Sequence, residues 1–253
     1  MPKVEEIIMK NVQAIILGAG KGTRINAKNI PKVMYLLAGR PIISYILDTL
    51  KKIKIKPVIV VGFKCEVIKK QFPPYDFALQ QKRLGTGHAV MCAKDKILPE
   101  TATILVLNGD DSAFYKPETL VNLILAHQKD DADLSLLTLV RNNPAGLGRI
   151  LRDKDGKILG IIEEKLATAT QKKIKEVNCG CYCFKPSFLW PALKKVKKNI
   201  TGEYFLTDVV GLAVKEGKKI ESFIMKEPNE WLGINTYEEL EQAQKKMQQC
   251  LAA

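Results

Sequence analysis

Short apolar runs alternate with longer amphipathic stretches along the first half of the 253-residue chain. The runs are rich in Val, Ile and Leu, which is typical of parallel strands buried on both faces. Between them, apolar residues recur at helical spacing, as at Ile42, Ile43, Ile46, Leu47 and Leu50. Strands are predicted over residues 12–17, 57–62, 77–79, 103–107 and 132–140, and helices over 40–52, 65–71, 89–97 and 117–127. This alternation predicts an α/β fold with a mixed, mostly parallel central sheet.

The second half of the chain has shorter apolar segments and more turn signals. Asp155-Gly156 lies between two apolar pairs, Ile150-Leu151 and Ile158-Leu159, and this pattern predicts a β-hairpin. Further strands are predicted around 161–165, 176–184 and 219–226, with helices over 202–216 and from residue 236, where Thr236 and Glu239 match a capping box. We therefore expect an antiparallel lid region over a Rossmann-like, three-layer core.

The most informative stretch is residues 17–32, LGAGKGTRINAKNIPK, which follows the first predicted strand. Its small residues allow a tight turn that brings backbone N–H groups against an anion, and Lys21, Arg24 and Lys32 add positive charge. Neither GxxxxGK[ST] nor GxGxxG is present, because the glycines at 18, 20 and 22 are spaced two apart. The glycines alone fit an ordinary strand-to-helix turn. Together with the cations, they favour a polyphosphate site.

A second glycine-bearing turn, Gly85-Thr86-Gly87, follows Gln80 and precedes a predicted helix. Backbone amides at a helix N-terminus favour an anion or a polar base edge, although these glycines by themselves are better explained by a plain turn. His88 is one of two histidines in the chain. We interpret it as structural, because transfer between phosphates requires no proton shuttle.

The clearest predicted strand, 103–107, ends in Asn108-Gly109-Asp110-Asp111. A carboxylate at the carboxyl end of a parallel strand lies where α/β sheets bind their ligands, and a divalent cation that bridges phosphates prefers such an oxygen. The alternative is that the aspartate caps the next helix, but that helix begins too far downstream. We predict that Asp110 is a metal ligand and that Asp111 lies behind it.

Composition and charge narrow the class of protein. Apolar residues make up 46% of the chain and charged residues 26%, which is typical of a globular domain. The net charge of +13 is compatible with a lysine-rich solvated surface, a nucleic-acid binder, or attraction of anionic substrates. Because no basic block is interleaved with aromatic residues, we expect no nucleic-acid partner, and we favour a solvated surface that also steers substrates.

No apolar run is long enough to cross a membrane, and the N-terminal residues do not resemble a secretory signal. We therefore expect no membrane partner and a cytoplasmic location. Cys179, Cys181 and Cys183 alternate along one predicted strand, which places all three thiols on one face. With no CxxC or histidine beside them to complete a metal site, buried thiols in a reducing compartment are the better interpretation.

The pattern G-x-G-(T/S)-R followed shortly by P-K resembles the signature of sugar-phosphate nucleotidyltransferases. Within that family the chain is most similar to the uridylyltransferase (pyrophosphorylase) domain of bifunctional N-acetylglucosamine-1-phosphate uridyltransferases. The resemblance extends from Val12 to about Leu240. It implies a single nucleotidyltransferase domain over 1–253, with a nucleotide-binding half (1–130), a sugar-binding half (131–235) and a C-terminal helix (236–253).

The resemblance also assigns roles to individual residues. It implies that Arg24 holds the departing pyrophosphate and that Lys32 bridges the reacting phosphates. Asp110 and Asn235 match magnesium ligands, so Mg²⁺ is the implied cofactor. Residues implied to bind the amino sugar are Gly148, Glu163 and Asn178; those implied to bind the nucleotide are Leu17, Gly18, Ala19, Gly20, Lys21, Gly22, Thr23, Gln80, Gly85, Thr86, Asn108 and Gly109.

The sequence departs from the family pattern in three features. The loop between Arg24 and Pro31 is one residue longer than usual, Asp111-Ser112-Ala113 replaces a small apolar residue, proline and leucine, and Cys179 stands where threonine is usual. The last two departures lie near the implied metal and sugar sites, so they bear on sugar specificity. The chain has no hexapeptide repeats, which implies a single-function enzyme or one served by a separate acetyltransferase partner.

The sequence thus predicts an enzyme that converts UTP and N-acetylglucosamine 1-phosphate to UDP-N-acetylglucosamine and pyrophosphate. One alternative keeps the chemistry with UTP, dTTP or CTP and another sugar 1-phosphate or a choline-phosphate-type acceptor. The other alternative is a non-catalytic, nucleotide-binding regulatory subunit. The combination of Arg24, Lys32, Asp110 and Asn235 argues against this last possibility.

Overall fold

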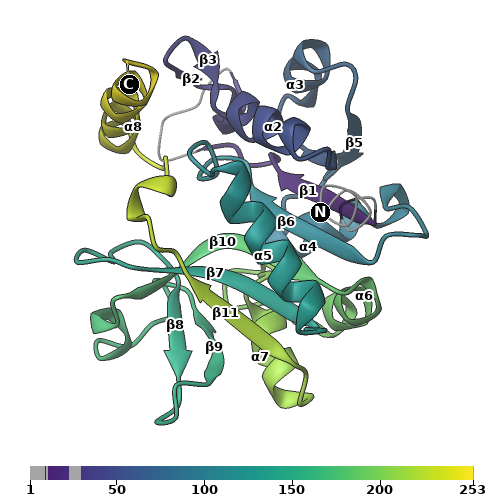
Figure 1. Ribbon diagram of the computed structural model, residues 1–253, viewed down its shortest axis with the longest axis vertical. Helices are drawn as coiled ribbons and strands as arrows, with labels where there is room; N and C mark the ends of the chain where they lie inside the picture. Colours follow the sequence, from purple (N-terminus) through teal and green to yellow (C-terminus); the bar gives the residue numbers. More distant parts are fainter. Residues whose placement is uncertain (1–8, 10, 23–29, 253) are drawn as a thin grey trace.

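A nine-stranded, mostly parallel sheet forms the centre of the protein, as a computed structural model shows for residues 9, 11–22 and 30–252 (Figure 1). Seven strands follow one path: β11 (Ile220–Ile224), β7 (Leu134–Val140), β10 (Glu176–Phe184), β6 (Thr103–Asn108), β1 (Val12–Leu17), β4 (Lys56–Val61) and β5 (Asp76–Leu79). Parallel pairing joins β1 to β4 and β6, β4 to β5, and β7 to β11, whereas β10 runs antiparallel to both β6 and β7. The predicted mixed, mostly parallel sheet is confirmed.

The predicted antiparallel region is also present. β8 (Arg149–Arg152) and β9 (Ile158–Ile162) form a hairpin, and β8 pairs with β10. The turn contains Gly156 at φ 81°, a conformation that favours glycine. The hairpin signal read from Asp155-Gly156 was therefore correct.

Helices cover both faces of the sheet, which gives three layers (Figure 1). α2 (Ile42–Lys52), α3 (Cys65–Gln71) and α5 (Pro117–Lys129) pack on one face, and α4 (Thr86–Cys92), α6 (Pro186–Lys195) and α7 (Asp208–Lys215) on the other. Alternate residues of β1 explain why the strand is apolar throughout. The apolar side chains form one cluster on each face of the sheet, the first under α2, α3 and α5 and the second under α4, α6 and α7. Ala14 and Ile16 belong to the first cluster, and Ile15 and Leu17 belong to the second.

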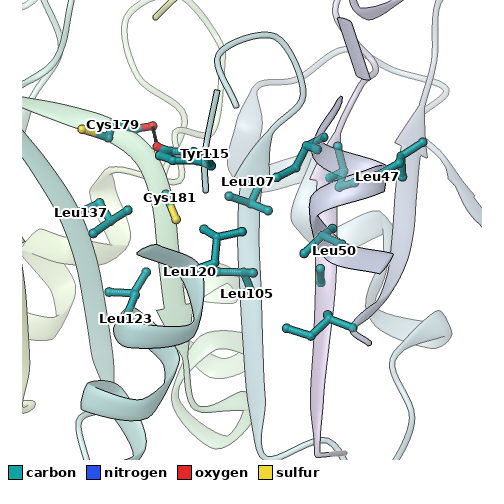
Figure 2. Close-up of a cluster of buried hydrophobic side chains, with 14 of the residues drawn as sticks. Leu47, Leu50, Leu105, Leu107, Tyr115, Leu120, Leu123, Leu137, Cys179 and Cys181 are labelled. Atoms are coloured by element: carbon teal, nitrogen blue, oxygen red, sulfur yellow. Dashed lines mark hydrogen bonds between the residues drawn. The ribbon is translucent and has the colours of Figure 1, made fainter. Parts of the chain in front are cut away.

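The first cluster also contains the three cysteines of β10. Cys179, Cys181 and Cys183 all lie in it, as their spacing predicted, and Figure 2 shows the first two beside Leu137 and Tyr115. Tyr115 Oη donates to the Cys179 carbonyl oxygen at 3.1 Å. Burial raises the pKa of each of these thiols, so they remain protonated.

The last helix, α8 (Tyr237–Ala252), packs against a small hairpin of β2 (Leu36–Leu37) and β3 (Arg40–Pro41). Its N-terminus has the predicted capping box: Glu239 N–H donates to Thr236 Oγ1 at 3.2 Å, and Thr236 N–H donates to Glu239 Oε2 at 3.1 Å. Among the described residues, none of the helices has the length and apolar character of a membrane span.

Several predicted boundaries were wrong. The helix predicted over 202–216 begins only at Asp208, because residues 204–206 instead bond to the turn at 84–87. The helix predicted from residue 89 begins at Thr86 and ends at Cys92, followed by a 3-10 turn over Lys94–Lys96. α6 and the β2–β3 hairpin were not predicted.

Candidate active site

A cavity of about 540 Å³ opens beside the carboxyl ends of β1 and β6. The cavity is lined by most of the residues that the resemblance assigned to nucleotide binding: Leu17, Ala19, Gly20, Lys21, Gly22, Gln80, Gly85, Thr86 and Asn108. Lys32 and Asp110 line it as well. This is the edge of the sheet where open α/β folds bind their ligands.

Gly18 and Gly109, two of the predicted nucleotide residues, are not among the residues that line the cavity. Gly18 N–H donates to the Val60 carbonyl oxygen at 2.8 Å, and Gly109 N–H donates to that of Leu17 at 3.0 Å. A Cβ on Gly109 would lie 3.0 Å from the Leu17 oxygen, so a larger residue would push the two strand ends apart. Thr23 and Arg24 fall outside the described residues.

Lys32 joins the two predicted metal ligands. Its Nζ forms an ion pair with Asp110 Oδ2 and donates to Asn235 Oδ1 at 2.8 Å. Three distant segments supply these groups: Lys32 starts a 3-10 turn after Pro31, Asp110 follows β6, and Asn235 precedes α8. The Lys32 side chain is only 10% exposed, so its charge acts in a partly desolvated site.

Backbone contacts fix the distance between Asp110 and Asn235. Ile234 N–H donates to the Asp110 carbonyl oxygen at 3.3 Å. Asn235 N–H donates to Glu239 Oε2 at 2.5 Å, which ties the asparagine to the first turn of α8. The side-chain oxygens of Asp110 and Asn235 thus face one point, where a carboxylate and an amide oxygen suit Mg²⁺. No three His, Cys, Asp or Glu side chains are grouped so that they could hold a metal ion among the described residues.

Asp111 points away from the cavity into the protein. Asn108 Nδ2 donates to its Oδ2 at 3.0 Å, and its Oδ1 has no hydrogen-bond partner among the described residues. Burial, and then the neighbouring charge of Asp110, raise the pKa of Asp111 well above its usual value. The side chains of Asn108 and Asp111 lie against Gly180, where φ is 65° and a Cβ would overlap the Asn108 side chain. The sequence carried no signal for this contact.

The three residues assigned to the sugar meet in a second group. Asn178 N–H donates to the Gly148 carbonyl oxygen at 2.9 Å. A Cβ on Gly148 would lie 3.6 Å from both Asn178 Cβ and Glu163 Oε2. Burial raises the pKa of Glu163, partly offset by a 3.0 Å hydrogen bond that its Oε1 accepts from Thr207 Oγ1. Asn178 Nδ2 donates to Tyr182 Oη at 2.6 Å.

Comparison with known proteins decides the family. The model of the nucleotidyl transferase family matches residues 13–250, nearly the whole chain. The chain belongs to the nucleotidyl transferase family. The resemblance inferred from the glycine-rich stretch is therefore confirmed.

Relatives of this nucleotidyl transferase include bifunctional GlmU proteins. That of Syntrophotalea carbinolica is 40% identical over 234 residues, which cover 91% of this chain and 50% of the relative. That of Enterococcus faecalis is 39% identical over 242 residues, which cover 94% of this chain and 52% of the relative. The chain thus spans about half the length of these relatives.

A solved structure confirms the fold. A Bacillus anthracis protein assigned as a glucose-1-phosphate thymidylyltransferase, crystallised with sucrose, superposes with a TM-score of 0.75 at 20% identity. The match covers 92% of this nucleotidyl transferase and 94% of that chain. At this identity the likeness supports the α/β architecture alone.

The contact between residues 203–207 and the second glycine turn was not predicted from the sequence. Tyr204 N–H donates to the Leu84 carbonyl oxygen at 2.7 Å, Gly87 N–H donates to that of Tyr204 at 2.8 Å, and Leu206 N–H donates to Thr86 Oγ1 at 2.9 Å. This pairing brings Glu203 to the cavity wall, near Arg83, and Thr207 to Glu163. The amphipathic pattern of the segment suggested a helix and concealed the contact.

Proposed function

We propose that this nucleotidyl transferase joins UTP and N-acetylglucosamine 1-phosphate to give UDP-N-acetylglucosamine and pyrophosphate. The observation that carries the proposal is the contact of Lys32 Nζ with both Asp110 and Asn235 at the rim of the cavity. The resemblance of the whole chain to GlmU proteins supports the uridine nucleotide and the amino sugar.

The proposed reaction is an in-line displacement at phosphorus. An ionised oxygen of the sugar phosphate attacks the α-phosphorus of UTP, and the bond from that phosphorus to the oxygen bridging to the β-phosphorus breaks. Pyrophosphate leaves with the bonding electrons, so no covalent enzyme intermediate and no general base are required. Holding the two substrates in line contributes up to ~7–11 kcal/mol to lowering the barrier.

Neutralisation of charge is the main task of the protein in this reaction. Two polyanions approach one another, and negative charge grows on the leaving group. Lys32 would move from its carboxylate partner to the reacting phosphates, and the backbone amides of the glycine loop would contact the triphosphate. We assign Arg24, which lies outside the described residues, to the departing pyrophosphate.

Asp110 and Asn235 would hold the magnesium ion, and Mg²⁺, when bound, would withdraw charge from the phosphate oxygens. Glu239 keeps Asn235 in place, because Glu239 Oε2 accepts a hydrogen bond from the Asn235 backbone N–H at 2.5 Å. We propose that Gly148, Glu163 and Asn178 bind the amino sugar. On this account residues 1–130 bind the nucleotide and 131–235 the sugar within one domain.

A substrate panel tests the proposal. UTP, dTTP, CTP and ATP are each combined with N-acetylglucosamine 1-phosphate, glucose 1-phosphate and phosphocholine, with Mg²⁺, and pyrophosphate release is measured. We expect the highest kcat/KM for UTP with N-acetylglucosamine 1-phosphate. Turnover of another pair at a higher kcat/KM would contradict the proposed substrates, and no turnover of any pair would favour a non-catalytic subunit.

The second candidate is thymidylyl transfer to a hexose 1-phosphate. The departures at Asp111, Ser112 and Cys179 lie near the implied metal and sugar sites and bear on the sugar, and the nucleotide named for the structural neighbour from Bacillus anthracis is the reason to include dTTP. The dTTP and glucose 1-phosphate arms of the same panel decide between the two.

A further inference from the structure

Gln80 is a buried side chain whose amide orientation is determined by its neighbours. It follows β5 at the base of the cavity and is only 4% exposed. Its Nε2 lies 3.0 Å from the Gly85 carbonyl oxygen, which can only accept a hydrogen bond. The amide nitrogen must therefore face Gly85.

The same nitrogen lies 3.0 Å from Nδ1 of His88. An amide nitrogen only donates, so Nδ1 must carry a lone pair and the ring proton of neutral His88 must be on Nε2. Partial burial of the ring lowers the pKa of His88, which favours the neutral form. Both Gln80 amide hydrogens are then used, one by Gly85 and one by His88.

This arrangement leaves Gln80 Oε1 as the polar atom that the side chain offers to a ligand in the cavity. Within the described part of the chain, no donor bonds to it. An oxygen in this position accepts a hydrogen bond from a nucleobase N–H. Uracil and thymine carry such a donor at N3, whereas N3 of cytosine is an acceptor and would be repelled.

We propose that His88 is a positioning residue that sets nucleobase selectivity, because its Nδ1 lone pair holds the Gln80 amide with Oε1 toward the base. The inference rests on the proposed function, in that the cavity must bind a nucleoside triphosphate. If the acceptor at Nδ1 were removed, the Gly85 carbonyl oxygen alone would hold the amide nitrogen, and rotation of the amide to present Nε2 to the cavity would cost less free energy. The NH₂ group would then suit cytosine.

A matched pair of variants tests the lone pair directly. His88→Asn places a carbonyl oxygen where Nδ1 lies, whereas His88→Leu has nearly the same shape as asparagine and no acceptor. The UTP-to-CTP ratio of kcat/KM is measured with one sugar 1-phosphate, and the Kd of each nucleotide with Mg²⁺ is measured by calorimetry without the sugar.

We expect His88→Leu to lower the UTP-to-CTP ratio about tenfold or more, which is the scale of one lost base contact, mainly through KM for UTP. His88→Asn should keep the ratio within about threefold of wild type. An unchanged ratio in His88→Leu, or an equal loss in both variants, would overturn the proposal.

A measurement on the wild-type protein covers the case in which His88→Leu does not fold. Long-range ¹H–¹⁵N NMR of the imidazoles reports the tautomer, and a His127→Asn variant assigns the two histidine signals. We expect an unprotonated Nδ1 in the free and UTP-bound protein, and a protonated Nδ1 would overturn the proposal. If no sugar phosphate is turned over but UTP binds more tightly than CTP, and His88→Leu reduces that difference in Kd while His88→Asn keeps it, the proposed function fails and this inference stands.

Discussion

Lys32 is the residue at which the glycine loop meets the two predicted metal ligands. Its ammonium group contacts the side-chain oxygens of both Asp110 and Asn235. The sequence predicted Asp110 as a ligand from its place after a buried strand, but Asn235 only through resemblance, because the two are 125 positions apart in the numbering. The contact of Lys32 with both depends on backbone packing around Ile234, which no local pattern reports.

Replacement of Lys32 by methionine keeps the length of the side chain and removes its charge. We expect kcat/KM for both substrates to fall about 10²–10³-fold, because a charge aimed at the transition state is lost. Lys56→Met is the control, since Lys56 forms an exposed ion pair with Asp76 on an outer part of the sheet. Pyrophosphate release measures both variants. Equal activity of the two would show that Lys32 plays no part in the chemistry.

At the scale of elements, the turn at 84–87 and the segment 204–206 form one unit held by backbone hydrogen bonds. Gly85 has φ 94°, and a Cβ there would lie 2.5 Å from the Tyr204 carbonyl oxygen. In the sequence, the glycines of this turn are compatible with a plain turn or with ligand binding, and neither interpretation includes a contact with residues 204–206. The structure adds a second reason for glycine, the close approach of another part of the backbone.

Gly85→Ala should therefore weaken UTP binding as well as stability. We expect a loss of roughly 1–3 kcal/mol in unfolding free energy, from the left-handed backbone and the displaced segment, and a rise in KM for UTP of about tenfold or more. Gly156→Ala is the control, because φ is 81° there and a Cβ would meet open space. Urea unfolding and steady-state kinetics decide; a Gly85→Ala variant that matches Gly156→Ala in both would contradict the coupling.

His127 provides a test of the packing between α5 and β7. It is buried, its Nδ1 lies 2.9 Å from Ser135 Oγ, and burial followed by the charge of Lys185 lowers its pKa to about 4. Below about pH 6.5 the unfolded chain binds a proton that the folded protein refuses, so stability falls as the pH drops from 6.5 to about 4. The contribution is at most about 3 kcal/mol.

His127→Asn removes this titration. We expect the free energies of unfolding of wild type and variant, measured in urea between pH 7 and pH 4, to converge or cross as the pH falls. Parallel curves would show that the pKa of His127 is the same in the folded and unfolded protein, which would contradict the lowered value.

At the scale of the whole molecule, hydrophobic patterning was sufficient for the sheet and for most helices. β1, β4 and β6 are apolar throughout because they are buried on both faces, and α3 was predicted with its exact limits. Elements whose form depends on distant contacts were missed. Residues 204–206 are extended because they pair with 84–87, and α6 contains Pro191, which conceals its helical pattern.

In the candidate site, too, residues that belong to a local sequence pattern were predicted and residues brought in by distant contacts were not. The glycine loop, Asp110 and the second glycine turn were found because each is a local pattern after a buried strand. Glu203 and Thr207 were not found, because they reach the site through folding of the second half of the chain over the first, and Arg83, which lies beside the second glycine turn, was not singled out. The wider claim is that this assembly brings two polyanions together for nucleotidyl transfer.

The most direct test of that claim is pyrophosphate formation by an Asp110→Asn variant, with UTP, N-acetylglucosamine 1-phosphate and saturating Mg²⁺. The change preserves the shape of the side chain and removes the charge that Lys32 contacts. Asp48→Asn is the control, because Asp48 forms an exposed ion pair with Arg40. Our account predicts a kcat at least about 10²-fold below wild type for Asp110→Asn alone, and turnover equal to that of the control would contradict it.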